Sequence, residues 1–184
     1  MDRTAKQVAA CIARWRETFS ILVASGRSDS HVLALIGTEL FFKDSVQRAL
    51  EYAAWALLSL LWPDRAERVS IGISQVQVRH WRNAGLISSS GPRLSTIALF
   101  LDPKANYDSA AAYLRMNGVT RHSTLREIAR TYRGEVRTYH MKVLAACMEQ
   151  VTEGSLLNAQ LAKTPQSCAT RKLSVGNGPS PQGF

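Results

Sequence analysis

The chain has 184 residues and a mass of 20.3 kDa, with 46% hydrophobic and 20% charged residues, which is the composition of one ordinary globular domain. A net charge of +9 and an isoelectric point near 9.9 predict attraction to polyanions. Charge alone does not choose among nucleic acid, anionic lipid and an acidic cell-wall polymer.

Cysteine usage and hydropathy exclude several classes of protein. Cys11, Cys147 and Cys168 are odd in number, far apart and without metal-ligand spacing, which argues against a disulfide framework and a zinc site. Residues 1–7 lack the pattern of a signal peptide. The most apolar run, residues 52–62, falls short of the roughly 20 residues that span a bilayer. We therefore expect no transmembrane segment and a protein that is cytoplasmic as synthesised.

The first predicted element is an amphipathic helix over residues 4–24, which ends at Ser25 and Gly26. Its apolar residues recur every three or four positions and are Val8, Cys11, Ile12, Trp15, Phe19 and Leu22. This spacing places them on one face of the helix, which we expect to pack against the core.

A second helix is predicted from Val32 to about Glu39, capped by Ser28, Asp29 or Ser30. Because its body is apolar, Glu39 should be poorly solvated. Poor solvation disfavours the ionised carboxylate, raises its pKa and allows it to act as a general acid. The alternative is that Glu39 only marks the polar end of a core helix.

Residues 46–61 predict a helix that is apolar almost all round, which is typical of the centre of a helical bundle. Pro63 and Asp64 end it. We expect its two tryptophans, Trp55 and Trp62, to pack in the core rather than to stack on a ligand.

Residues 70–78 alternate enough to form a short strand, but their glycine and polar residues favour an extended entry into a helix over about residues 76–84. Ser74, Gln75 and Gln77 offer donors and acceptors for sugar hydroxyl or acetamido groups. The alternative is a polar turn followed by a helix cap.

The next segment predicts two helices joined by a turn. Residues 95–101 form a short apolar helix, and the turn over residues 102–106 makes Asn106 the N-cap of the next helix. Asp108 then lies in the first turn, where a carboxylate favours the helix dipole. This helix should end at Asn117.

Thr124 and Glu127 have the spacing of a capping box for a helix over residues 125–132. The last long helix has an apolar stripe formed by Val136, Tyr139, Val143, Leu144, Cys147 and Val151. We predict an all-α fold with one helical domain over residues 1–160 and a disordered tail over residues 161–184, which has no acidic residue.

In order, these motifs resemble the lysozyme-like superfamily, in particular the lytic transglycosylases and the glycosyltransferase domain of penicillin-binding proteins. The matching features are a helix that ends in Glu39, Gly-x-x-Gln at residues 72–75, Asp-Pro-x-x-Asn at 102–106, Ala-Tyr-Leu at 112–114 and Ala-x-x-Tyr at 129–132. Each motif alone is weak, and the resemblance depends on their shared order.

The resemblance covers roughly residues 30–147 and has three departures. The separation of glutamate and glutamine is wider than in typical lytic transglycosylases and closer to that of the glycosyltransferases. The aspartate that follows the glutamate in the glycosyltransferases is Leu40 here, and the Tyr-Asn pair of lytic transglycosylases is Tyr132 with Arg133. The third departure is the missing export signal.

The resemblance implies that Glu39 protonates the glycosidic oxygen between N-acetylmuramic acid and N-acetylglucosamine in peptidoglycan glycan strands. Its substrate-binding residues would be Ser74, Gln75, Gln77, Asn106 and Tyr132. Because no second carboxylate has motif support, we expect one acid and a 1,6-anhydro product, with hydrolysis as the alternative. No metal or organic cofactor is expected. A secretion, conjugation or phage-lysis system would deliver the protein to the periplasm or cell wall.

Two other functions stay open. Residues 78–87 resemble the recognition-helix end of a MerR-type helix-turn-helix regulator, and residues 124–139 resemble a second such unit. The positive charge also favours nucleic-acid binding. Against it, residues 78–87 lack room for a preceding helix. The other alternative is a catalytically inactive lysozyme-like module that binds glycan or serves as a scaffold.

Overall fold

The computed structural model describes residues 2–88, 94–134 and 136–152. Within these ranges the chain is mostly helical, with one short hairpin, so the predicted all-α class is confirmed. The predicted tail over residues 161–184 lies outside the described residues, as does the domain boundary at residue 160.

The first predicted helix is in fact two. α1 (Arg3–Arg14) and α2 (Arg16–Ala24) are separated at Trp15, whose backbone leaves helical geometry with φ −99° and ψ 17°. The two halves pack on different partners, because α1 contacts α10 and α3 whereas α2 contacts α8. A single straight helix could not reach both.

α3 (Ser30–Phe42) forms the centre of the N-terminal group of helices. Of the three candidate caps, Asp29 is the one used, since its carboxylate accepts hydrogen bonds from the backbone N–H groups of His31 and Val32. Every residue from Val32 to Leu40 is buried. α10 (Thr138–Thr152) packs along α3, and α1 covers both.

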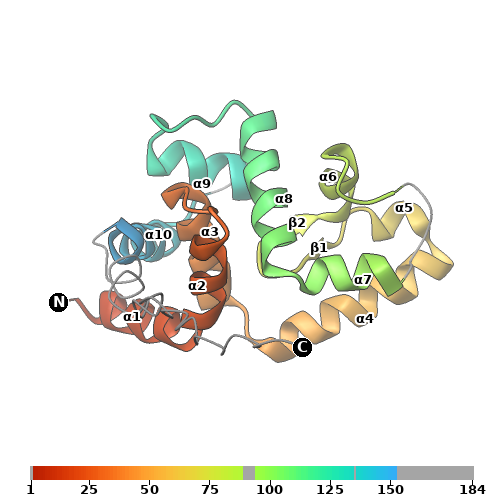
Figure 1. Ribbon diagram of the computed structural model, residues 1–184, viewed down its shortest axis with the longest axis horizontal. Coiled ribbons are helices and arrows are strands. Elements are labelled where there is room, and N and C mark those ends of the chain that lie inside the picture. The colour runs from red at the N-terminus through yellow and green to blue at the C-terminus, as the bar shows by residue number, and fades with distance from the viewer. Residues whose placement is uncertain (1, 89–93, 135, 153–184) are drawn as a thin grey trace, which may run out of the picture.

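The prediction that residues 46–61 form the centre of the bundle is wrong. α4 (Ser45–Leu61) lies at the edge of the molecule, followed by the short α5 (Pro63–Ala66), and Figure 1 shows the pair along its lower right. Of the residues of α4, only Arg48 and Trp55 are buried. Trp62, predicted to lie in the core, is 53% exposed. The reason is that α1, α3 and α10 fill the N-terminal core by packing on one another.

Residues 70–77 form a hairpin rather than a simple extended entry. β1 (Ser70–Ile71) pairs antiparallel with β2 (Val76–Gln77), and α6 (Val78–Asn83) follows directly. The turn requires Gly72, which has φ +77°, and a Cβ atom there would lie 1.9 Å from Asn106 Oδ1. The glycine therefore allows the hairpin to approach the helix that carries Asn106.

That helix is α8 (Pro103–Met116), which contacts α2, α3 and α9 on one side and α6, α7 and β2 on the other. Figure 1 shows it between the two groups of elements. α7 (Leu94–Leu101) precedes it and α9 (Leu125–Arg133) follows. The capping box predicted at Thr124 is confirmed.

The N-cap predicted for α8 is wrong. The cap is Asp102, whose carboxylate accepts hydrogen bonds from the backbone N–H groups of Lys104 and Ala105. Asn106 already lies inside the helix, because Pro103 is well suited to the first helical position and starts the helix earlier.

Candidate functional site

Glu39 lies in the last turn of α3 and is only 2% exposed. The burial predicted from its apolar neighbours is therefore confirmed. Burial raises the pKa of this carboxyl above its ordinary value of 4.5, against the opposing effects of Arg133 and Lys43, which lower it. Burial thus favours the protonated form of Glu39 more than in an exposed glutamate, whereas its cationic neighbours favour the ionised form.

Arg133, the last residue of α9, forms an ion pair with Glu39. Its Nη2 lies 2.6 Å and its Nε 3.1 Å from Glu39 Oε1. Both hydrogen bonds go to the same oxygen, so Oε2 stays outside this ion pair. The side chain of Arg133 is 31% exposed, whereas that of Glu39 is 3% exposed, so the arginine covers the acid from the solvent side.

Two side chains hold Arg133 over the acid. His140 Nε2 lies 3.1 Å from Arg133 Nη1, and the guanidinium carbon lies 5.5 Å from the centre of the Phe42 ring. The pKa of His140 is lowered by burial and by the charges of Arg133 and Arg137, which keeps the imidazole neutral and able to accept from Arg133.

Gln75 is brought to the same region by the hairpin turn. It has a left-handed φ of +54°, and its Nε2 donates to Glu51 Oε2 at 2.7 Å and to the carbonyl of Gly72 at 2.9 Å. Its Oε1 accepts from Lys43, which also pairs with Glu51. Lys43 and Glu51 both act electrostatically on Glu39, so this network lies beside the buried acid.

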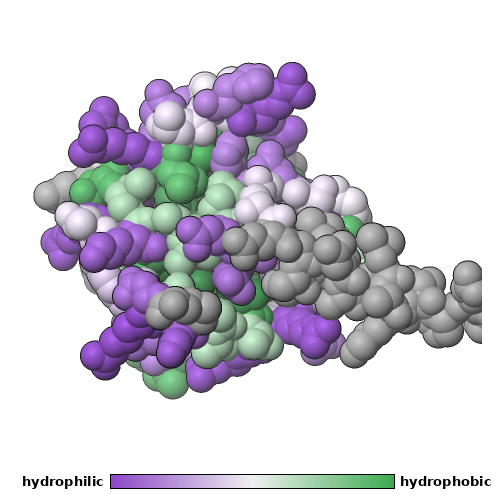
Figure 2. All heavy atoms as spheres, turned by 90° about the vertical axis from the view of Figure 1, so that its left-hand side faces the viewer, coloured by the Kyte–Doolittle hydropathy of each residue, from purple (hydrophilic) through white to green (hydrophobic). Residues whose placement is uncertain are grey.

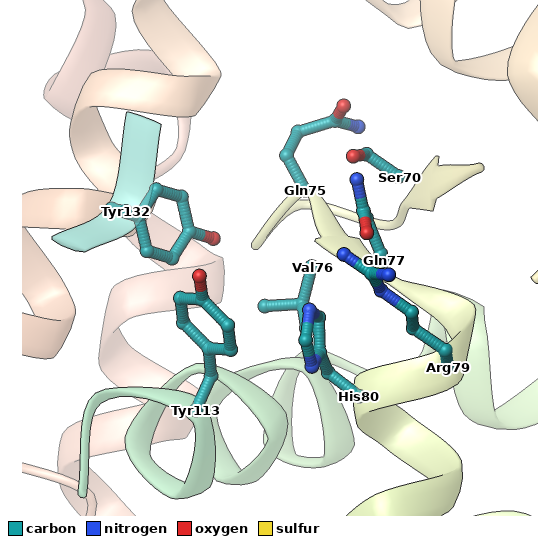
Figure 3. Close-up of a pocket in the computed structure, with 8 residues that line it drawn as sticks. All are labelled: Ser70, Gln75, Val76, Gln77, Arg79, His80, Tyr113 and Tyr132. Carbon is teal, nitrogen blue, oxygen red and sulfur yellow. The ribbon is translucent and has the colours of Figure 1, made fainter. Parts of the chain in front are cut away.

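A cavity of about 120 Å³ opens between the hairpin and α8 and α9. Its lining, drawn in Figure 3, is Ser70, Gln75, Val76, Gln77, Arg79, His80, Tyr113 and Tyr132. Three of the predicted substrate-binding residues, Gln75, Gln77 and Tyr132, therefore meet at one cavity. Glu39 is not among the lining residues.

Two polar atoms at this cavity are buried and have no hydrogen-bond partner within the described part of the chain. They are the hydroxyl of Tyr132 and Oε1 of Gln77. Burial, followed by the charge of Glu39, raises the pKa of Tyr132 well above its ordinary value, so the phenol stays protonated and can donate. Buried polar atoms without partners are costly in a stable core, and a ligand could satisfy both.

The tyrosines belong to one aromatic group. The hydroxyl of Tyr113 donates to the backbone carbonyl of Thr131 at 3.1 Å, and its ring lies 5.8 Å from that of Tyr132 and 4.6 Å from the imidazole of His80. In Figure 3 the hydroxyl ends of the two tyrosines point toward one another, with Gln77, Arg79 and His80 to one side. This packing fixes the orientation of Tyr132.

The other two predicted substrate-binding residues, Ser74 and Asn106, are not exposed to a cleft. Asn106 is 0% exposed, and its Oδ1 accepts from the backbone N–H and the hydroxyl of Ser74 at 3.2 and 3.1 Å. Its Nδ2 donates to the carbonyls of Phe100 and Asp102. Both residues tie the hairpin turn to α8, because a buried amide has to satisfy all its hydrogen bonds.

Sequence reasoning missed Lys43, Glu51 and His140, and noticed Arg133 only as a departure from the Tyr-Asn pair. A signal was present, since a carboxylate predicted to be buried needs a cationic partner. The sequence did not indicate which cation, because Arg133 is 94 positions from Glu39.

The helix-turn-helix alternative finds little geometric support. α6 has only six residues, Val78 and Trp81 on it are buried, and β2 precedes it where a helix would be needed. α10, which would be the recognition helix of the second unit, packs its buried residues Val143, Leu144, Ala146, Cys147 and Val151 toward α3 and α1.

In the part of the chain that the structure describes, no cluster of three or more His, Cys, Asp or Glu residues could hold a metal ion. None of the described helices has the length and hydropathy needed to cross a membrane. No family model, curated protein or solved structure matches this chain.

Proposed function

We propose that this protein cleaves the glycosidic bond between N-acetylmuramic acid and N-acetylglucosamine in peptidoglycan, with Glu39 as its one acid and base. The observation that carries the proposal is a buried carboxyl with a raised pKa, which interacts electrostatically with Tyr132 of the cavity and with Lys43 and Glu51, the hydrogen-bond partners of Gln75. These residues come from α3, the hairpin turn and α9, so three distant segments contribute to one region.

In the proposed reaction Glu39 protonates the oxygen that links the two sugars as the bond from this oxygen to C1 of N-acetylmuramic acid breaks. The C6 hydroxyl of the same sugar then forms a bond to C1 and gives its proton to Glu39. The carboxyl is thereby restored, a 1,6-anhydro product forms, and no water is consumed. Hydrolysis would require a water in place of the C6 hydroxyl.

Gln75, Gln77 and Tyr132 bind the glycan in this scheme. Gln77 Oε1 and the hydroxyl of Tyr132 supply an acceptor and a donor that lack partners within the described residues. Support for this assignment is that both residues line the same cavity. Ser74 and Asn106 have the supporting role of holding the hairpin turn.

Arg133 has to leave Oε1 before Glu39 can donate a proton, because its two hydrogen bonds stabilise the ionised carboxylate. The arginine is partly exposed and also contacts His140 and Phe42. Its partial exposure allows it to turn toward solvent or toward an anionic group of the substrate, a movement that would break these contacts.

The proposal is tested by incubating purified protein with peptidoglycan sacculi and identifying the released muropeptides by mass spectrometry. We expect anhydro products from the wild type, and a loss of about 100-fold or more in Glu39→Gln, as for removal of a general acid. Glu17→Gln, which removes an exposed acid of α2, is the matched control and should keep full activity. Equal release by wild type and Glu39→Gln would remove Glu39 from the reaction.

The ion pair between Arg133 and Glu39 favours a second candidate function, an inactive glycan-binding module, because it stabilises the ionised form of the carboxylate. In that case the wild type and Arg133→Asn both sediment with sacculi and release nothing. If the protein is an enzyme, Arg133→Asn, which restores the Tyr-Asn pair of the lytic transglycosylases, should keep or increase activity because it removes the cation from Glu39.

A further inference from the structure

The exposed face of α4 carries no charge. Each exposed residue of this helix is uncharged, and the only polar ones are Ser45 and Gln47. The large apolar side chains on this face are Val46, Leu50, Leu57, Leu60 and Leu61, which are 67%, 65%, 57%, 74% and 54% exposed. We call these five residues, together with Ala53 and Ala54, the α4 face.

The α4 face is continuous along the helix. At about 100° per residue, its members fall within an arc of roughly 120° around Leu57, and the helix is about 25 Å long. Arg48 and Trp55 lie on the opposite side, where Trp55 packs against Phe100 with ring centres 4.9 Å apart. The α4 face is thus a complete apolar stripe turned away from the rest of the fold.

The charged residues of α4 do not interrupt this stripe. Arg48 is turned inward, with its guanidinium carbon 5.0 Å from the centre of the Trp15 ring. Glu51 is bonded to Lys43 and Gln75 on the side of the hairpin. By contrast, Figure 2 shows hydrophilic residues interspersed across the side of the molecule where α1 and α10 lie. An exposed apolar stripe of this extent is typical of a protein contact.

Six of the seven residues of the α4 face are placed symmetrically about its centre, and the counterpart of the seventh, Leu60, is Gln47. Leu50 and Leu57 lie equally far from the midpoint between Ala53 and Ala54, and so do Val46 and Leu61. In an antiparallel pair of identical helices, a twofold axis at that midpoint sets Leu50 of one copy against Leu57 of the other. The small alanines then lie at the crossing point, where they allow close approach.

We propose that the α4 face binds a second copy of this chain, with the two α4 helices antiparallel about an axis beside Ala53 and Ala54. The absence of exposed basic side chains from α4 itself favours a copy over an anionic lipid surface, because helices that bind such surfaces are rich in Lys and Arg on their polar face. The absence of exposed charge on α4 also lowers the electrostatic cost of bringing two copies together. Two chains of net charge +9 repel one another, and contact costs least where neither presents a charge.

The test is analytical ultracentrifugation of the full chain over a range of concentrations. We expect a dimer that dissociates on dilution and that tightens as salt is raised, since salt screens the repulsion between the basic copies. Leu50→Glu and Leu57→Lys should each weaken the dimer by about 30-fold or more, because each buries a charge against a leucine.

The double variant Leu50→Glu with Leu57→Lys distinguishes this arrangement from every other. In the antiparallel pair each new glutamate meets the partner's new lysine, so the dimer should recover most of the loss. Met116→Glu, at a 56% exposed apolar residue on α8, is the control and should leave the dimer unchanged. Circular dichroism of each variant checks that the fold is intact.

Several results would overturn the proposal. They are a monomer at all concentrations, a dimer that Leu50→Glu leaves intact, and single variants that weaken the dimer without recovery in the double variant. A monomer that binds vesicles with an anionic lipid fraction through the α4 face would assign the face to lipid instead. None of these readouts uses activity on sacculi, so they are independent of the proposed function.

Discussion

α3 and α4 are neighbours in the sequence and both are strongly apolar, but α3 is buried and α4 is largely exposed. In α3 every residue from Val32 to Leu40 is buried, including the acid Glu39. In α4 only Arg48 and Trp55 are buried, and all of its leucines except Leu58 are exposed. Hydrophobicity is therefore a poor guide to burial here, because a helix is buried only where other elements of the chain are available to cover it.

The difference is visible in what packs on each helix. α10 packs along α3, and α1 and α8 also contact it. Gly37 makes the first of these contacts close, since a Cβ atom at this position would lie 3.3 Å from Cys147 Sγ. α4 mainly contacts α5 and β1, which cover one side only.

The prediction with the largest expected effect compares the loss of a leucine side chain in α3 with the same loss in α4. Leu33→Ala, at a 1% exposed residue of α3, should lower the free energy of unfolding by about 3 kcal/mol, because it leaves a cavity in a packed core. Leu57→Ala on α4 should change it by about 0.5 kcal/mol or less. Urea unfolding at a concentration where the protein is monomeric measures both. Similar losses for the two variants would mean that α4 is covered in solution.

The prediction of intermediate size concerns Glu39, the buried acid of α3, and its effect on how stability depends on pH. Since the pKa of Glu39 is raised above 4.5 in the folded protein, the folded state favours the protonated form. The corresponding stability is fully present below pH 4.5 and is lost as pH rises through the folded pKa. Glu39→Gln cannot ionise, so it should gain stability relative to the wild type with rising pH, by at most about 1.4 kcal/mol per pH unit.

The measurement is the free energy of unfolding of both proteins between about pH 4, close to the ordinary pKa of a glutamate carboxyl, and about pH 8. Glu17→Gln serves as the exposed control and should run parallel to the wild type. A difference between Glu39→Gln and the wild type that shrinks as pH rises would show that Arg133 outweighs burial and holds the pKa of Glu39 low.

The smallest effect is expected where the two helices meet. Lys43 follows α3 and pairs with Glu51 on α4, and their side chains are 29% and 23% exposed. A double-mutant cycle with Lys43→Met and Glu51→Gln should give a coupling of about 0.5 to 1 kcal/mol, discounted for solvent screening. Coupling near zero would indicate that Gln75, which bonds to both, replaces either partner.

Part of the candidate site could be predicted from local pattern. The apolar residues before Glu39 indicated its burial, and the polar residues of segment 70–78 indicated Gln75 and Gln77, which line a cavity in the structure. Asn106 was misassigned because an asparagine after Asp-Pro can be either a cap or an interior residue. Here Asp102 caps the helix and Pro103 starts it earlier, and the amide of Asn106 finds its buried partner in Ser74 across the fold.

By itself, the sequence determined most of the helical segments, the cap at Thr124 and that an acid ends an apolar helix. These features depend on neighbours within a few positions. Only the tertiary structure decided that Arg133 covers Glu39 and that the α4 face is left exposed. Both outcomes depend on which surfaces are already occupied by segments distant in the chain, and helical periodicity carries no information on that.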